Sequence, residues 1–300
     1  MSLLVVGSIA YDSIKTPHGE VYEVLGGSAV YFSLAARQFG PVRLVGVVGE
    51  DFRPRDVDFL KQRDVDTAGL ETVAGGKTFR WSGEYSPDMN SRETLSVELN
   101  VFEDFQPKIP DSFRDSPFVF LANGAPGTQI AVLDQIERPE FVMADTMDLW
   151  IQTQRADLIE LLRRIDGLLL NDSEAHLLTD QPNVIAAGKA ILEMGPKRVV
   201  IKKGEHGAIL FTAEEIIPLP AYPVESVRDP TGAGDSFAGA LMGHLTKRGA
   251  VDRGVFKEAL AHGTIMASTT VEDFGVDRIG NLTAVEIEDR FSRFRGFLPL

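Results

Sequence analysis

The chain has 300 residues, of which 44 are acidic and 30 are basic, so its formal net charge is −14 at pH 7. This acidic balance argues against sequence-independent nucleic-acid binding, which depends on a positive field. The absence of cysteine excludes disulfides, thiolate metal sites and cysteine nucleophiles, and it fits a reducing, cytoplasmic environment.

The sequence also predicts no membrane partner. It has no apolar run of about 18 residues, the length that a membrane-spanning helix needs. The first eight residues are apolar, but the segment is short and lacks a basic flank, so we expect no targeting segment there.

Short apolar runs alternate with amphipathic segments along the chain. A helix is predicted over 28–38, where Ser28 follows two glycines as a capping residue and Gly40 ends the segment. A second helix is predicted over 184–193, before the Gly-Pro pair at 195–196. This alternation predicts an α/β fold with a mainly parallel central sheet and helices on both faces. The expected buried strands are Leu3–Val6, Val42–Val48, Phe118–Leu121, Phe141–Ala144, Leu168–Leu170 and Val199–Ile201.

Two polar segments, 13–24 and 77–101, break this pattern. Their period-2 alternation, as in Thr78 and Arg80, predicts exposed antiparallel strands that are at most half covered. Such strands would form a lid over a site, and a surface hairpin without function is the alternative. We find no internal repeat, so we expect residues 1–300 to form a single domain that carries this small antiparallel lid.

The segment Asp229–Ala240, DPTGAGDSFAGA, carries the strongest chemical signal. Gly232, Ala233 and Gly234 lack bulk, and an apolar pattern of helical period follows Asp235, so a helix begins at these small residues. The free N–H groups and the positive dipole end of such a helix make an anion site. A carboxylate there suits a base that deprotonates a nucleophile attacking the anion, which describes phosphoryl transfer. The alternative is that Asp235 merely complements the helix dipole.

Other catalytic motifs are not matched, because the residues they require do not occur at the required spacing. A Walker loop ending at Gly76-Lys77-Thr78 would need glycine at position 71, where this chain has Glu71, and no G-x-G-x-x-G follows the first strand. Ser236 misses the G-x-S-x-G pattern because the glycine falls at position 239, although a serine hydrolase stays open as an alternative. The five histidines lack the H-E-x-x-H spacing, so zinc hydrolysis is not expected.

Several motifs together resemble the ribokinase-like, or phosphofructokinase-B-type, kinases of carbohydrates and nucleosides. Asp229–Ala240 resembles their C-terminal signature, and Leu25–Gly40 resembles their N-terminal glycine signature. Asn171–Glu174 resembles their N-x-x-E motif, Ile201–Gly207 their K-x-G-x-x-G stretch, and Gly46–Asp51 a further recurrent segment. The motifs stand in family order and span nearly the whole chain. The resemblance implies a ribokinase-like fold and ATP-dependent phosphorylation of a hydroxymethyl group on a small sugar or sugar derivative.

The resemblance also implies roles for individual residues. Asp235 would be the catalytic base, and Gly232, Ala233 and Gly234 would form the anion hole around the transferring phosphoryl group. Glu174 would organise Mg²⁺ through water, an ion that prefers oxygen ligands and keeps several waters. The nucleotide-binding residues would be Asn171, Lys202, Gly204 and Gly207, with His262, Thr264 and Ala267 as candidates for the adenine pocket on a late helix, 259–270, that could equally be a core helix.

Two further implied sites are less specific. Asp229 and Thr231 resemble positions near a monovalent-cation site in several relatives, which leaves a K⁺ requirement open. The acceptor would bind near Asp12, because a carboxylate can accept two hydrogen bonds from a polyol. The expected acceptor-binding residues are Asp12, Gly26, Gly27, Ser28, Tyr31 and Arg80.

The choice of acceptor is affected by two departures from the family pattern. Ribokinase proper has Asn where this chain has Ala10 and Tyr31, which weakens a ribose-specific assignment. Tyr31 would stack on a base or on an apolar ring face, or else it is a core tyrosine. A nucleoside kinase for adenosine, inosine or cytidine is therefore the alternative within the family. A non-catalytic sugar sensor is a further alternative, against which the intact Asp235 argues.

The predicted lid carries aromatic and basic side chains. In this family such lids close over the substrate and exclude water, which protects the phosphoryl donor from hydrolysis. Lids also pair between subunits in some relatives, and an unpaired strand edge is a liability, so we expect a homodimer. The arginines could instead face solvent. The side chains concerned are Phe79, Arg80, Trp81 and Tyr85, with Asn90 and Arg92 near the turn.

Overall fold

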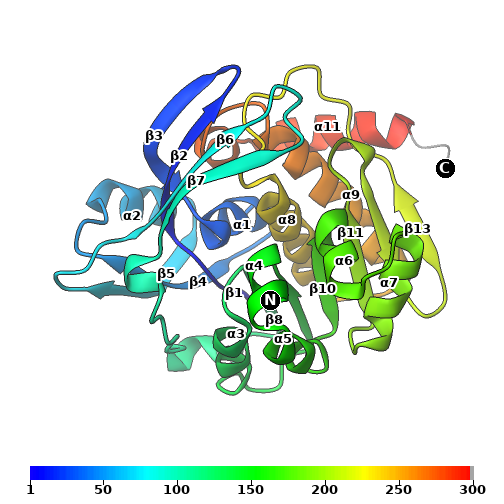
Figure 1. The fold of residues 1–300 in the computed structure, drawn as a ribbon, viewed down its shortest axis with the longest axis horizontal. Helices are drawn as coiled ribbons and strands as arrows, with labels where there is room; N and C mark the ends of the chain where they lie inside the picture. The colour runs from blue at the N-terminus through cyan, green and yellow to red at the C-terminus, as the bar shows by residue number, and fades with distance from the viewer. Residues whose placement is uncertain (298–300) are drawn as a thin grey trace.

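A nine-stranded sheet forms the centre of the molecule, in a computed structural model that describes residues 1–297 (Figure 1). Seven neighbouring strands, from β5 to β11 across the sheet, pair in parallel, and β12 and β13 add an antiparallel edge. The predicted strands are confirmed, with ends that differ by at most one residue. In spatial order the strands are β13 (Ile216–Leu219), β12 (Ala208–Phe211), β11 (Arg198–Lys202), β10 (Gly167–Asn171), β9 (Phe141–Asp145), β8 (Phe118–Leu121), β1 (Leu3–Val6), β4 (Val42–Gly49) and β5 (Val65–Val73).

Helices cover both faces of this sheet, as predicted. Alternate residues of β1 enter different apolar clusters: Leu3 and Val5 join one cluster, and Leu4 and Val6 join the other. The first cluster includes residues of α1 (Ser28–Ala36), α2 (Pro54–Lys61), α8 (Ala233–Arg248), α9 (Arg253–Thr270), α10 (Asp277–Gly280) and α11 (Ala284–Phe297). The second includes residues of α3 (Pro126–Leu133), α4 (Asp148–Thr153), α5 (Arg155–Leu162), α6 (Asp172–Thr179) and α7 (Val184–Glu193).

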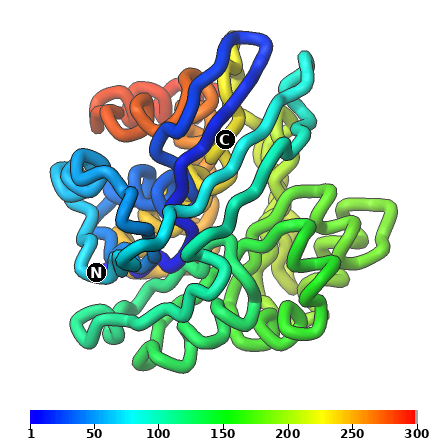
Figure 2. Tube along the Cα trace, turned by 60° about the vertical axis from the view of Figure 1, so that its left-hand side comes forward, coloured from blue at the N-terminus to red at the C-terminus, as the bar shows by residue number. Residues whose placement is uncertain are grey.

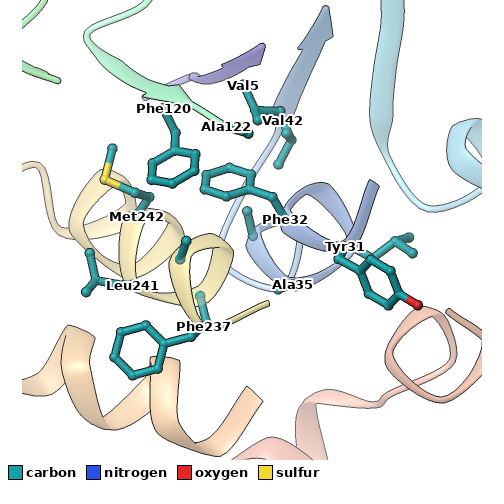
Figure 3. Close-up of a cluster of buried hydrophobic side chains, with 14 of the residues drawn as sticks. Val5, Tyr31, Phe32, Ala35, Val42, Phe120, Ala122, Phe237, Leu241 and Met242 are labelled. Carbon is teal, nitrogen blue, oxygen red and sulfur yellow. The ribbon is translucent and has the colours of Figure 1, made fainter. Parts of the chain in front are cut away.

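Helix α1 packs closely against α8, and Figure 3 shows the apolar contacts of this pair with the sheet. All nine residues of α1 are buried, and the Phe32 ring stacks on Phe120 of β8 with centroids 4.5 Å apart. A Cβ at Gly239 of α8 would overlap the carbonyl oxygen of Phe32 and stand 2.9 Å from the Cβ of Ala35. Glycine is therefore required there for the two helices to approach each other.

The start of α1 corrects one expectation. Ser28 is not the capping residue, because the helix is preceded by Gly27 with φ of 96° and no side chain caps its first turn. The helix ends at Ala36, two residues before the predicted end, whereas α7 spans 184–193 as predicted.

The lid is a separate four-stranded sheet that stands at the carboxyl edge of the central sheet. In Figure 2 its two hairpins, blue and cyan, run side by side away from the body of the molecule. Each hairpin is antiparallel, but β2 and β6 pair in parallel, so the lid is a mixed sheet. The strands are, in order, β3 (Gly19–Gly26), β2 (Ala10–Thr16), β6 (Phe79–Tyr85) and β7 (Arg92–Glu98).

Burial in the lid differs from the expectation of half-covered strands. Every residue of β7 is exposed, in line with that expectation. However, Tyr11, Asp12 and Ile14 of β2 are buried, because this strand forms the base of the lid and body residues cover both of its faces there. Among the described residues, no helix has the length and apolar character needed to cross a membrane.

The contact between α1 and α8 yields a stability prediction. We expect Gly239→Ala to lower the free energy of unfolding by about 1–3 kcal/mol, since the added methyl group has no space. The control is Gly127→Ala in the first turn of α3, where a Cβ meets nothing within 4 Å. It should be neutral or stabilising by up to about 1 kcal/mol. Urea unfolding of both variants tests this, and equal stabilities would contradict the packing argument.

Candidate active site

Three adjacent strands bring polar side chains to one edge of the central sheet. Asp145, Asn171 and Lys202 are the last residues of β9, β10 and β11, and Asn171 pairs in register with Lys202. Ligands of open α/β sheets bind outside the carboxyl ends of the strands. The sequence analysis did not select Asp145, although a carboxylate directly after a buried apolar strand could have marked it.

The first turn of α8 lies at the same edge and has unsatisfied donors. Gly232 precedes the helix with φ of 74°, and a Cβ there would overlap the ring of Tyr31. The amide of Ala233 donates to the Pro230 carbonyl at 3.2 Å, whereas those of Gly232 and Gly234 have no acceptor among residues 1–297. Free amides at a helix N-terminus attract anions, so this turn can hold a phosphoryl group.

Lys202 places a positive charge beside these amides. A Cβ at Gly234 would stand 2.5 Å from the Lys202 Nζ, so the absence of a side chain at position 234 makes room for the ammonium group. Within residues 1–297 the ammonium forms no ion pair within 4.0 Å. The predicted residues Gly232, Gly234 and Lys202 therefore lie close together at the start of α8.

Burial raises the pKa of three carboxyl groups around this position. For Asp235 and Glu174, burial is the largest influence, and the nearby charge of Lys202 opposes it. For Asp145, burial and then the charge of Asp235 raise the pKa well above its ordinary value. A carboxyl group whose pKa is raised toward neutrality is suited to accept a proton from a substrate hydroxyl.

The N-x-x-E motif has a structural role that the sequence analysis did not foresee. It forms a capping box at the start of α6: Glu174 N donates to Asn171 Oδ1 at 2.8 Å, and Asn171 N donates to Glu174 Oε2 at 2.7 Å. The Glu174 Oε1 atom has no hydrogen bond to a described residue. No three His, Cys, Asp or Glu residues in 1–297 are arranged to hold a metal ion directly.

Asp12 lies on the lid side of the site and requires the glycine pair beside it. A Cβ at Gly26 would overlap the Asp12 carboxylate, and the neighbouring Gly27 backbone lowers the pKa of that carboxyl group. Burial raises the pKa of Asp12 to about 7, and the charges of Asp229 and Asp235 add to this effect. The charge of Asp235 raises the pKa of Asp12, so the two carboxyl groups lie near each other.

Ser28 and Tyr31 are buried and are not free to contact an acceptor. The Ser28 Oγ lies 3.0 Å from the Ser8 Oγ, and its amide donates to the same Ser8 oxygen at 3.1 Å. Tyr31 is 1% exposed and lies under Gly232, so the core-tyrosine alternative describes its ring (Figure 3). Its hydroxyl has no hydrogen-bond partner among the described residues.

Arg80 does not face the acceptor space, which corrects the expectation for this residue. Residues paired in register share a face of the sheet, and Arg80 pairs with Tyr11 whereas Asp12 pairs with Trp81. The Arg80 guanidinium donates to Glu23 at 2.9 Å and to Asp51 at 2.7 Å. Arg80 thus anchors the lid to the Gly46–Asp51 segment.

Trp81 instead occupies the face that carries Asp12. A Cβ at Gly83 would overlap the benzo ring of Trp81, so the indole lies over the backbone of Gly83. On the same strand, the Tyr85 hydroxyl lies 3.1 Å from the Thr231 Oγ1, next to the first turn of α8. Near the lid turn, Asn90 Nδ2 donates to Glu205 Oε1 at 3.4 Å. The lid therefore spans the site and contacts its far side.

The remaining nucleotide-side and cation residues are placed as follows. Gly204, with φ of 53°, and Gly207, with φ of 88°, form the turn between β11 and β12, as the sequence predicted. The Asp229 carboxylate accepts hydrogen bonds from the amides of Thr231 at 2.8 Å and Gly275 at 3.2 Å. Asp229 therefore holds together the loops before α8 and after α9.

His262 has no free ring face for a purine, which corrects the expectation for the adenine pocket. Its ring stacks on Phe291 at 4.3 Å and on His244 at 4.6 Å between centroids. Thr264 is buried with an unpartnered hydroxyl, and Ala267 packs against the core. The core-helix alternative therefore describes this part of α9 better.

Ser236 is fully buried, and its hydroxyl has no hydrogen-bond partner among the described residues. No base is thus in place to activate it, and the structure does not support the serine hydrolase alternative.

The chain is similar to known proteins over most of its length. The model of the pfkB family carbohydrate kinases matches residues 127–282. The cytidine kinase of Thermococcus kodakarensis is 28% identical over 249 residues, which cover 81% of this chain and 87% of that protein.

Solved structures confirm the predicted fold. The nucleoside kinase of Burkholderia thailandensis, in complex with inosine, aligns with a TM-score of 0.79 and 20% identity, covering 99% of this chain and 100% of that chain. A putative ribokinase II from E. coli, in complex with ATP and Mg²⁺, aligns with a TM-score of 0.78 and 20% identity, covering 97% and 99% of the two chains.

The buried Asp12 yields a prediction on pH. Its pKa is about 7 in the folded chain against 3.8 as the ordinary value, so the folded chain retains a proton that the unfolded chain loses. The stabilisation that this carboxyl group contributes is complete when the pH is below 3.8, and it is lost as the pH rises through about 7. We expect wild type to lose roughly 3 kcal/mol relative to Asp12→Asn between about pH 5 and pH 8.

Urea unfolding of both proteins at the two pH values measures this difference. Parallel pH dependences of wild type and Asp12→Asn would show that Asp12 is ionised throughout this range.

Proposed function

Because this chain belongs to the pfkB family of carbohydrate kinases, we propose that it is an ATP- and Mg²⁺-dependent nucleoside kinase that phosphorylates a primary hydroxyl group. The position of Trp81 is the observation that favours a nucleoside as the acceptor. Its indole lies over Gly83 on the lid face that carries Asp12, in register with Asp12 itself. An aromatic side chain and a carboxyl group thus lie next to each other on the lid face of the acceptor space.

This pair of groups suits a nucleoside better than a free sugar. A carboxylate recognises sugar hydroxyls, whereas stacking of a base on an aromatic side chain adds about 1–3 kcal/mol whatever the base. The similarity to a cytidine kinase over most of the chain supports this proposal. A small sugar stays the second candidate, because Asp12 beside the Gly26 backbone would bind its hydroxyls equally well.

The chemistry follows from the carboxyl edge of the sheet. Asp235 takes the proton of the acceptor hydroxyl, whose oxygen forms a bond to the γ-phosphorus while the bond to the β-phosphate oxygen breaks and ADP leaves. The amides of Gly232 and Gly234 donate to the charge that develops on the transferring group. Asp12 orients the acceptor, and the lid excludes water from the transfer.

The metal and the nucleotide would be held by the neighbouring strand ends. Oxygen donors suit Mg²⁺, and the Glu174 Oε1 and the Asp145 carboxylate would bind its waters, with Asn171 holding Glu174 in place. When bound, the ion offsets negative charge on the phosphates. Lys202, Gly204 and Gly207 would lie beside the nucleotide.

Two further parts of this proposal concern conditions. Asp229 and Thr231 would border a monovalent-cation site. Measuring activity with K⁺ and again with a large organic cation in its place tests this site. We also propose a cytoplasmic location, where ATP and free nucleosides are available; fractionation of the source cells tests it.

The base is tested by Asp235→Asn. This change keeps the size of the side chain and removes the proton acceptor, so turnover should fall on the order of 10²–10⁴-fold while the fold and ADP binding persist. Ser236→Ala is the control, and it should retain activity. ADP release with the best acceptor measures both. Unchanged turnover in Asp235→Asn would contradict the assignment, and no turnover in wild type would favour a sensor.

The acceptor class is tested by Trp81→Leu. Loss of the aromatic surface should raise KM for nucleosides about 10–100-fold, since stacking contributes about 1–3 kcal/mol. KM for ribose and other free sugars should change little. A screen of nucleosides, pentoses, hexoses and sugar acids with wild type and variant measures this. Turnover of sugars but not of nucleosides by wild type would overturn the nucleoside proposal in favour of the sugar candidate.

A homodimer would cover the outer edge of the lid. Strand β7 lies at the edge of the lid sheet, and Leu95 and Val97 on it are 53% and 51% exposed. Exposed apolar strand edges tend to pair with another chain. We expect wild type to sediment as a dimer and the double variant Leu95→Glu, Val97→Glu to sediment as a monomer; a wild-type monomer would contradict this.

A further inference from the structure

Asp12 and the proposed base stand on different parts of the molecule. Asp12 belongs to β2, the strand that forms the base of the lid, whereas Asp235 belongs to α8 of the body. An acceptor that Asp12 binds has to present its hydroxyl group to Asp235. The distance between the two carboxyl groups therefore depends on how firmly β2 is attached to the body beside Asp12.

Tyr11, the residue next to Asp12, makes such an attachment on the opposite face of β2. Its side chain is 1% exposed, and its hydroxyl donates to the Asp56 Oδ2 at 2.8 Å and accepts from the Arg53 amide at 2.9 Å. Arg53 directly precedes α2, and Asp56 lies in the first turn of that helix. One phenol group thus uses both its donor and an acceptor position to join the lid strand to a body helix.

Two arginines connect the ring of Tyr11 to β3. The guanidinium carbon of Arg53 lies 4.3 Å from the ring centroid, and Arg53 also donates to the Glu23 carbonyl oxygen at 2.8 Å. The guanidinium carbon of Arg80 lies 5.8 Å from the same centroid, and its Nε donates to the Glu23 Oε1 at 2.9 Å. Cations are attracted to the face of an aromatic ring, so Glu23 holds together two groups that already favour this position.

Glu23 has an unusual backbone conformation that supports these contacts. Its φ is 45°, in the left-handed region that residues other than glycine rarely adopt. It stands at a β-bulge directly after Asp12, where Tyr22 and Glu23 of β3 oppose Ser13 of β2. The Glu23 amide donates to the Ser13 Oγ at 3.1 Å. Bulges next to active sites change the direction of side chains, and strained backbone persists only where its surroundings hold it.

We propose that Tyr11 is a positioning residue, whose attachment to the start of α2 holds the Asp12 carboxyl group at the distance from Asp235 that transfer requires. The inference rests on the proposed kinase activity, and it adds a residue that does not touch the acceptor. Adjacent residues of a strand point to opposite faces, so a shift of Tyr11 displaces Asp12 as well. A displacement of about 1 Å can lower a rate about 10²-fold, so a hydrogen bond behind the strand can control acceptor binding and transfer.

The first test is Tyr11→Phe, which removes one oxygen atom and keeps the ring. We expect the acceptor KM to rise about 5–30-fold, with the KM for Mg²⁺–ATP changed less than about twofold. A variant that had only lost stability would contain less active enzyme, so its kcat would fall and neither KM would change. The matched control is Tyr22→Phe, because this tyrosine belongs to the same hairpin and is 69% exposed; it should behave as wild type.

The partner of the phenol gives a conservative and a disruptive variant. Asp56→Asn keeps a carbonyl oxygen to which the phenol can donate, whereas Asp56→Ala leaves the phenol without this acceptor. We expect Asp56→Asn to retain most of the acceptor affinity and Asp56→Ala to match Tyr11→Phe.

A double variant tests whether Tyr11 acts through Asp12. Tyr11→Phe combined with Asp12→Asn should bind the acceptor as well as Asp12→Asn alone, because the group that Tyr11 positions is already lost. Additive losses would overturn the inference. An acceptor KM of Tyr11→Phe within twofold of wild type would also overturn it.

The pKa of Asp12 reports the placement of this carboxyl group whether or not the acceptor is known. Burial raises it to about 7, and the charges of Asp229 and Asp235 add to this effect. The Gly27 backbone and the charge of Arg92 act in the opposite direction. The pKa therefore falls when the strand shifts and water reaches the carboxyl group.

Carbon-13 NMR of the Asp12 carboxyl group measures this pKa, and the signal is identified by its loss in Asp12→Asn. Tyr11→Phe should lower the pKa by about 1 or more, toward 3.8, and Tyr22→Phe should leave it unchanged. An unchanged pKa in Tyr11→Phe would overturn the inference even where the kinase assignment holds. A lowered pKa in Tyr11→Phe, with wild type inactive toward every acceptor, would overturn the proposed function and leave the positioning of Asp12 supported.

Discussion

The position of the first turn of α8 is the constraint on which the rest of the site depends. Gly239 lets α8 approach the backbone of α1, and Gly232 lies directly on the ring of Tyr31. This packing directs the open end of the helix toward the carboxyl ends of the strands, where no group of residues 1–297 accepts from the amides of Gly232 and Gly234. These open donors are therefore a consequence of how two buried helices fit together (Figure 3).

The same edge of the sheet is unusually acidic for a site that would receive phosphate groups. Burial raises the pKa of Asp145, Glu174 and Asp235, and the charge of Lys202 opposes this effect at each of them. A site of this kind favours proton transfer but repels an anion. A bound metal ion would therefore have to offset part of the charge of the phosphates.

The two faces of the lid sheet carry side chains that make different contacts. Tyr11 and Arg80 lie on one face, where Arg80 donates to Glu23 within the lid and to Asp51 of the body. Asp12 and Trp81 lie on the other face, toward the site. Because adjacent residues of a strand point in opposite directions, two neighbouring residues have different roles.

The sequence by itself determined the α/β class, the buried strands and the small-residue turn at 232–235, because these depend on local periodicity and on residue size. Motif order also placed Asp12, Asn171 and Lys202 near one site. Tertiary structure alone decided which face of the lid Arg80 occupies, that the rings of Tyr31 and His262 are covered, and that Asp145 lies near Asp235. Those facts depend on strand register and on helices far apart in the chain, which no local pattern encodes.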